Sequence, residues 1–223
     1  MYIYAFSNYT DIVTDRLSDK KSMLTKRFSR TDNFINLALL GVQNCMQEIE
    51  IDKESSIYLA SRNGNMNTTL KVLDAIFLQE RLPMPFNFLN SVNASTLFFI
   101  AKNFNIEGKT LFLDSFESAL SQAFVDAKNN KSILLGSVEE VISDLEFHKQ
   151  RFKSKTIEEY SRWLLISHNI SDKKPIAKIS NIRLTISNQK ESNLSDLFDF
   201  FEKSDNSFNF IGQNLIFDIK KII

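Results

Sequence analysis

The segment from Lys109 to Ser137 constrains the fold of this chain most strongly. It reads KTLFLDSFESALSQAFVDAKNNKSILLGS, a short strand, a sharp turn, a helix and a second strand in succession. A strand that passes into a helix and returns as another strand is the building unit of α/β proteins. The segment therefore predicts a layered α/β domain with a mostly buried sheet.

The same alternation runs through the preceding residues. A helix is predicted from Thr31, as its N-cap, to about Glu50, because its apolar residues recur every three or four positions. The short strand SSIYLAS follows and ends at an Asn63-Gly64 turn. A second helix is expected from Thr68 or Thr69 to about Leu82, then a loop in FNFLNSVNAS, then a helix over roughly 94–103.

The two ends of the chain give weaker patterns. The first thirty residues predict only a short strand at Tyr2–Phe6. Beyond Asp144, RWLLIS and PIAKISNIRLTIS resemble two strands, either separate or joined as a hairpin across HNISDKK. A helix in NLSDLFDFFEKS and a last strand in NLIFDIKKII complete a chain that we expect to form one domain over 1–223.

Composition excludes several function classes. Lys plus Arg and Asp plus Glu number 27 each, so nothing in the net charge attracts the chain to nucleic acid or acidic membranes. No apolar stretch approaches the roughly 20 residues of a membrane span, and the N-terminus lacks the pattern of a signal peptide. The single cysteine, Cys45, excludes an internal disulfide. We therefore expect a cytoplasmic protein.

Few residues offer chemistry. His148 and His168 lie in polar segments without the spacing of metal ligands, and both are expected in solvated loops. Cys45 lies on the apolar face of a predicted helix, which favours burial. Glu139 and Glu140 follow a predicted strand and are expected at its solvated end. The sequence predicts no metal site and no cofactor.

Ser115 stands at the turn from strand to helix, where a helix N-terminus favours developing negative charge. A serine nucleophile elbow needs small neighbours, whereas this serine is flanked by Asp114 and Phe116. The pattern favours a helix cap over a nucleophile.

The order of these segments resembles the N-terminal half of β-ketoacyl-acyl carrier protein synthases. IYLASRNGNMNTTLKVLDAI is similar to that family's strand, turn and helix with an LAS-R-G pattern, and NSVNAS resembles its F-x-x-S-V-x-N-A segment, one residue shorter. LDSFESAL resembles its nucleophile turn, and SILLGSVEE the strand that follows. The likeness covers about 31–167, leaving 168–223 as a short C-terminal extension, and is greatest to short synthase-like proteins of aryl polyene and polyketide systems.

The resemblance implies a thiolase-like α/β/α fold without the synthase's chemistry. It places Phe116 at the position of the acyl-carrying cysteine, and a phenyl ring has no lone pair with which to attack a thioester. A one-residue shift in the alignment would offer Ser115 instead. The family's two catalytic histidines come from its C-terminal half, and His168 fits neither of their loops. We therefore expect no enzymatic activity.

The resemblance also implies partners. Synthases of this family are dimers in which the strand before the nucleophile pairs across the twofold axis, and some pair an active subunit with an inactive chain length factor. The corresponding dimer-interface candidates are Thr110, Leu111, Phe112, Leu113, Asp114 and Ser115. Candidates to line or plug an acyl tunnel are Phe98, Phe99, Phe112 and Phe116, although phenylalanines at such spacings more often fill a core.

Three hypotheses follow. The leading one is an inactive subunit in a homo- or heterodimer, with a full-length ketosynthase as its partner in fatty acid, polyketide or aryl polyene synthesis. The second is a stand-alone protein that binds acyl groups or acyl carrier protein, and the third is a thioesterase or acyltransferase that uses Ser115. An acidic carrier protein would dock on basic residues, and two runs are candidates, the first Lys20, Lys21, Lys26, Arg27 and Arg30 and the second Lys149, Arg151, Lys153 and Lys155.

Overall fold

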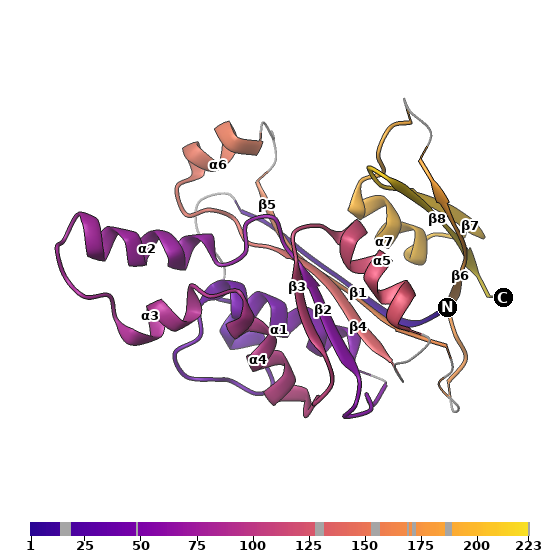
Figure 1. Ribbon diagram of the computed structural model, residues 1–223, viewed down its shortest axis with the longest axis horizontal. Coiled ribbons are helices and arrows are strands. Elements are labelled where there is room, and N and C mark those ends of the chain that lie inside the picture. The colour runs from indigo at the N-terminus through magenta and orange to yellow at the C-terminus, as the bar shows by residue number, and fades with distance from the viewer. Residues whose placement is uncertain are drawn as a thin grey trace.

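The computed structural model describes residues 1–13, 19–47, 49–127, 132–152, 157–168, 170, 173–185 and 189–222. In this part of the chain eight strands form one sheet in the order β3-β2-β4-β5-β1-β6-β8-β7 (Figure 1). The strands are β1 (Tyr2–Ile12), β2 (Ser56–Ala60), β3 (Thr110–Leu113), β4 (Ile133–Glu139), β5 (Glu158–Ser167), β6 (Ala177–Leu184), β7 (Ser207–Ile211) and β8 (Leu215–Lys221). The α-helices are α1 (Asn33–Cys45), α2 (Met66–Phe77), α3 (Pro85–Asn90), α4 (Ala94–Phe104), α5 (Phe116–Asp126), α6 (Leu145–Phe152) and α7 (Leu194–Glu202), and Lys20–Met23 form a 3-10 turn.

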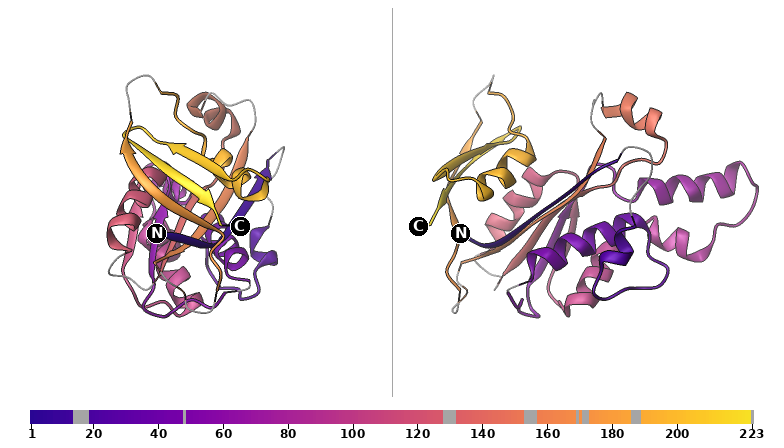
Figure 2. Two further views of the ribbon diagram at one scale, coloured as in Figure 1. Left: turned by 90° about the vertical axis from the view of Figure 1, so that its right-hand side faces the viewer. Right: turned by 180° about the vertical axis from the view of Figure 1, so that it is seen from behind.

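Helices cover both faces of the sheet, which confirms the predicted α/β/α layers (Figure 2). Successive residues of β2 point to opposite faces, so Ile57 and Leu59 enter one core while Tyr58 and Ala60 enter the other. Helices α1 and α4 pack on the first face, and α5 and α7 pack on the second. Trp163 of β5 is fully buried against Gly136 of β4, where a Cβ atom would clash with its ring.

The N-terminal strand is longer and more central than the sequence indicated. β1 runs to Ile12 and pairs antiparallel with β5 along its whole length, from Tyr2 opposite Ser167 to Ile12 opposite Glu158. It also pairs with the start of β6. Because β1 lies between β5 and β6, these two strands do not form the hairpin that was one of the alternatives for this region.

Several helix boundaries also differ from the prediction. Asp32, rather than Thr31, caps α1 by accepting a hydrogen bond from the Ile35 backbone N–H. The second helix begins after Asn65 and follows a turn in which Gly64 has a φ of 54°, a left-handed conformation that favours glycine. The expected loop FNFLNSVNAS contains the short helix α3, which starts with Pro85 at its first turn.

The C-terminal residues extend the same sheet. Strands β6, β8 and β7 add to β1, and α7 packs its phenylalanines into the core that α5 also covers. The last two strands form the antiparallel pair β7–β8, of which only β8 was expected from the sequence. Both ends of the chain therefore build the half of the sheet that lies beyond β5.

Candidate functional site

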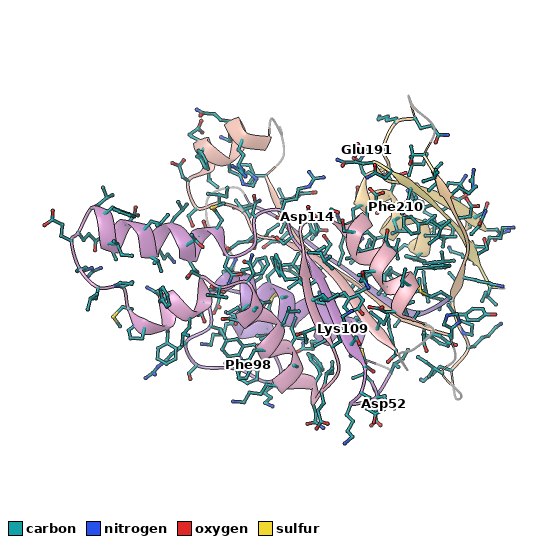
Figure 3. The ribbon with its side chains drawn as sticks, viewed as in Figure 1. Asp52, Phe98, Lys109, Asp114, Glu191 and Phe210 are labelled. Atoms are coloured by element: carbon teal, nitrogen blue, oxygen red, sulfur yellow. The ribbon has the colours of Figure 1, made fainter. Side chains whose placement is uncertain are left out.

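A cleft of about 600 Å³ opens where the parallel strands β2, β3 and β4 end. Its walls include the N-terminus of α5 and the segment that joins β7 to β8. Asp114, on the turn after β3, and Glu191, from the C-terminal part of the chain, both border it (Figure 3). Carboxyl ends of parallel strands are where open α/β sheets bind ligands, so this cleft is the candidate site.

Ser115 lies in the cleft wall and caps α5. Its Oγ accepts a hydrogen bond from the Ser118 backbone N–H at 3.2 Å and donates to Ser118 Oγ at 2.8 Å. The residue has extended backbone angles, as an N-cap does. This confirms the capping role predicted for Ser115.

Phe116, the first residue of α5, is 7% exposed and points into the core below the cleft. Its ring meets those of Phe198 and Phe210 edge to face, with centroids 6.4 and 5.7 Å apart. These partners come from α7 and β7, so the C-terminal part of the chain closes over the turn that starts α5 (Figure 3).

Glu117, the next residue of α5, binds the turn between β7 and β8. Its two carboxylate oxygens accept hydrogen bonds from the backbone N–H groups of Gln213 and Asn214, at 2.7 and 3.0 Å. A Cβ at Gly212 would clash with this carboxylate. Gly212 leaves room for this carboxylate beside the β7–β8 turn.

Glu139 is not at a solvated strand end, contrary to the prediction. Its carboxylate accepts hydrogen bonds from the backbone N–H groups of Arg62 and Asn63 and from Ser61 Oγ, at 2.5, 3.3 and 3.2 Å. Burial raises its pKa above the ordinary value for glutamate. The acid holds the turn after β2 in place, and that turn covers it.

Glu140 and His148 are both buried, so the predictions that they are solvated were wrong. Glu140 is 5% exposed, and burial raises its pKa to about 7, with the nearby carboxylates Asp32 and Glu159 adding to the rise. His148 is buried on α6, where its Nδ1 accepts a hydrogen bond from the Ile142 N–H at 3.2 Å and burial lowers its pKa. His148 borders the same cleft as Ser115, but the hydroxyl is already engaged in the cap. His168 is exposed, as expected.

The four phenylalanines proposed for an acyl tunnel lie on two faces of the sheet. Phe116 belongs to the core under α5 and α7 and borders the cleft. Phe112 and Phe99 pack against the opposite core, and Phe98 is 59% exposed on α4 (Figure 3). The structure therefore does not bring the four rings together, and Phe116 is the member of the set that borders the cleft.

The dimer-interface candidates lie on an open sheet edge. β3 pairs with β2 along one side and is the last strand of the sheet on the other, within the described residues. The carbonyls of Lys109 and Leu113 accept from β2, so by alternation the backbone groups of Thr110 and Phe112 point away from it. Asp114 is exposed beyond the strand and Leu111 is half-buried.

The proposed basic docking runs are only partly exposed. Lys20 is buried, 1% exposed, with its Nζ 2.5 Å from carboxylates of both Asp11 and Glu159, so it belongs to the core rather than to a docking surface. Lys26, Arg27 and Arg30 are exposed and Lys21 is half-buried. In the second run Lys149 and Arg151 are exposed, while Lys153 and Lys155 lie outside the described residues.

The described residues contain no cluster of three or more His, Cys, Asp or Glu able to hold a metal ion. No helix in this part of the chain has the length and apolar character needed to cross a bilayer. Cys45 is buried as predicted, and burial raises the pKa of its thiol to about 12.

Comparison with solved structures identifies the fold. A chain of the ketosynthase ApeO in complex with its chain length factor ApeC, from Xenorhabdus doucetiae, superposes with a TM-score of 0.67 at 14% identity, covering 99% of each chain. The ishigamide ketosynthase/chain length factor gives 0.68 at 13% identity, over 84% of this chain and 68% of the other. The type II polyketide synthase complex AntDE:AntF gives 0.59 at 10%, over 86% and 65%.

No protein-family model matches the sequence, and no curated protein matches it. At identities of 10–14% the shared property is the backbone architecture. The chain therefore has the thiolase-like α/β fold of ketosynthases and chain length factors.

Proposed function

We propose that this chain is a non-catalytic subunit of the chain-length-factor kind, which pairs with an active ketosynthase in fatty acid, polyketide or aryl polyene synthesis. The observation that carries the proposal is the residue at the start of α5. The family resemblance assigns Phe116 to the turn where a synthase presents its nucleophile, and two rings from the C-terminal part of the chain contact it. A hydrocarbon ring in that place offers no atom for covalent catalysis.

Two further features support a partner. Among the residues that the structure describes, the sheet ends at β3 with backbone groups that face away from β2, and a second chain can pair with such groups. The complexes named above are ketosynthases with a chain length factor or with an acyl carrier protein. A heterodimer with a ketosynthase in a cytoplasmic synthesis pathway accounts for both features.

The experiment is a pull-down of the tagged chain from its own cells, followed by co-expression with the ketosynthase identified by mass spectrometry. The products of the complex with wild-type chain are then compared with those of Phe116→Ala, with Leu184→Ala at the exposed end of β6 as the control. A change in product length with the ketosynthase still active supports the proposal. Recovery of the tagged chain as a homodimer alone, or identical products from Phe116→Ala, contradicts it.

A stand-alone protein that binds acyl groups or carrier protein is the second candidate, and the open cleft of about 600 Å³ favours it. Direct titration with an acyl carrier protein distinguishes the two, because this candidate binds without a ketosynthase present. The third alternative, a Ser115-dependent thioesterase or acyltransferase, predicts labelling by a serine-reactive probe that Ser115→Ala abolishes.

A further inference from the structure

Helices α2 and α3 project from the body at the end of the molecule opposite β6–β8 (Figures 1 and 2). Between the end of α2 and the end of α3, six large apolar side chains are more than half exposed. They are Phe77, Leu78, Leu82, Met84, Phe88 and Leu89, and Leu82 reaches 92%. We call this surface, with the exposed face of α2, the arm.

The apolar residues of α2 lie on two sides of the helix, one buried and one exposed. Val72 and Ala75 face inward and are buried, whereas Leu73 and Phe77 lie on the opposite side of the helix and are exposed. A helix of a soluble protein that covers one core normally has one apolar stripe. Within the described residues this second stripe stays largely open, since Leu73 is 42% and Phe77 73% exposed.

The size of the arm fits a protein partner. The arm exposes apolar side-chain surface on the order of 1,000 Å², above the few hundred Å² usual on a monomer and comparable to one side of a stable protein interface. Exposing that much apolar surface is costly, because burial contributes roughly 25 cal/mol for each Å² removed from water.

The charges of the arm argue against a membrane. Between Met66 and Asn93 the charged residues are Lys71 and Arg81 against Asp74 and Glu80, so the arm has no basic excess. A helix that binds anionic lipid presents lysines and arginines around its apolar face. A balanced rim around an apolar centre is instead the anatomy of a protein–protein interface.

The arm is also continuous with the open sheet edge. Helix α4 contacts both α3 and β3, and Phe98 is exposed on α4. A partner strand that pairs with β3 would bring its chain alongside α4 and α3. One partner can therefore reach the edge strand, Phe98 and the arm together.

We propose that the arm binds the ketosynthase with which this chain pairs, and that it forms an apolar clasp beside the strand pairing of β3. This rests on the proposed function. The clasp contributes the burial of apolar area, and β3 contributes the alignment of the two sheets. The surface assigned to the partner is thus β3, Phe98 and the arm, and it excludes the opposite end of the molecule.

The test compares two exposed leucines that lie at opposite ends of the molecule, Leu82 and Leu184. Leu82→Cys places a thiol on the arm, and Leu184→Cys places one at the end of β6, where the leucine is 79% exposed. Cys45 is buried with a raised thiol pKa, so a maleimide-benzophenone probe labels only the introduced cysteine. Each labelled chain is mixed with the purified ketosynthase, irradiated and digested for mass spectrometry.

Crosslinks from position 82 to ketosynthase peptides, with few from 184, support the clasp. An intact complex without crosslinks from 82, or with equal yields from 82 and 184, overturns it and leaves the proposed function standing. Crosslinks from 82 to a second copy of this chain overturn the choice of partner. Failure of the wild-type chain to bind the ketosynthase at all overturns both proposals.

Affinity gives a second measurement. The double variant Phe77→Ser/Leu82→Ser should raise the Kd for the ketosynthase by tenfold or more, because two apolar contacts are lost. Leu184→Ser should leave the Kd unchanged. Since Phe77 and Leu82 are 73% and 92% exposed, circular dichroism should show both variants folded like the wild type. An unchanged Kd for the double variant overturns the proposal.

Discussion

The ring of Phe116 meets the ring of Phe210 edge to face, with centroids 5.7 Å apart and ring planes at 85°. One residue starts the helix after the edge strand β3, and the other lies on β7 near the end of the chain. Aromatic pairs in this geometry add to the stability gained from burial alone. The contact joins the parallel part of the sheet to its C-terminal part across the floor of the cleft.

Phe116→Ala should therefore destabilise the protein. Removing a buried phenyl ring costs about 3–5 kcal/mol, since it forfeits the ring's burial and leaves a cavity. Urea unfolding followed by circular dichroism measures the loss. Phe98→Ala, at a position that is 59% exposed, should cost less than about 1 kcal/mol. Equal losses in the two variants would show that Phe116 does not hold the two parts together.

The sequence predicts the parallel part of the sheet well because the signals there are local. Strands β2 and β3 are short apolar runs, and each is followed by a helix with apolar residues every three or four positions. The start of the helix at Phe116 and its cap Ser115 could be placed to the residue. Such patterns depend on neighbours within one or two turns.

The sequence could not indicate which strands pair when they lie far apart along the chain. Nothing within residues 2–12 shows that this strand inserts between β5 and β6, whose partner residues are at least 146 positions away, as Ile12 opposite Glu158 shows. Glu139 and Glu140 follow a buried strand and look solvated, but the turn at Ser61 and the start of β5 cover them. The rule that ligands bind at the carboxyl ends of parallel strands would have directed attention to both acids.

Glu117→Ala should loosen the β7–β8 turn. The substitution removes the acceptors of two backbone N–H groups, and because both bonds are exposed the global loss should be about 1 kcal/mol or less. Hydrogen exchange at the amides of Gln213 and Asn214 should accelerate. Glu117→Gln, which retains one acceptor oxygen, should protect one of the two. Unchanged exchange at both amides would contradict the assigned contacts.

Ser115→Ala should cost about 1 kcal/mol of stability, because the N-cap acceptor of α5 is lost. Ser115→Asp should restore most of it, since aspartate caps helices well and its charge suits a helix N-terminus. Thermal melts compare the three proteins. A Ser115→Asp variant no more stable than Ser115→Ala would mean that the hydroxyl has another role.

Glu140 should make stability fall as pH rises. Its folded-state pKa is raised from 4.5 to about 7, so between these values the unfolded chain has lost a proton that the folded chain retains. The penalty is absent below about pH 4.5 and complete above about pH 7, where it is about 3 kcal/mol. Glu140→Gln should be more stable than wild type at pH 8 and similar to it at pH 4.5.

Urea unfolding from pH 4.5 to 8 measures the difference between wild type and Glu140→Gln. Taking this difference separates Glu140 from His148, whose lowered pKa acts in the opposite direction below pH 6.5. Glu107→Gln is the control for the same substitution at an exposed position, since the Glu107 side chain is 62% exposed. Parallel curves for wild type and Glu140→Gln would show that the carboxyl titrates normally.

Thr110→Pro tests the open edge of β3 without touching its pairing with β2. The backbone N–H of Thr110 points away from β2, so proline removes a donor that only a partner strand would use. The complex with the ketosynthase should weaken by tenfold or more, while the unfolding midpoint of the isolated chain changes little. Thr110→Ala retains the N–H and should bind normally. If the proline variant binds as tightly as the alanine variant, β3 does not pair with the partner, and the two sheets must meet through side chains alone.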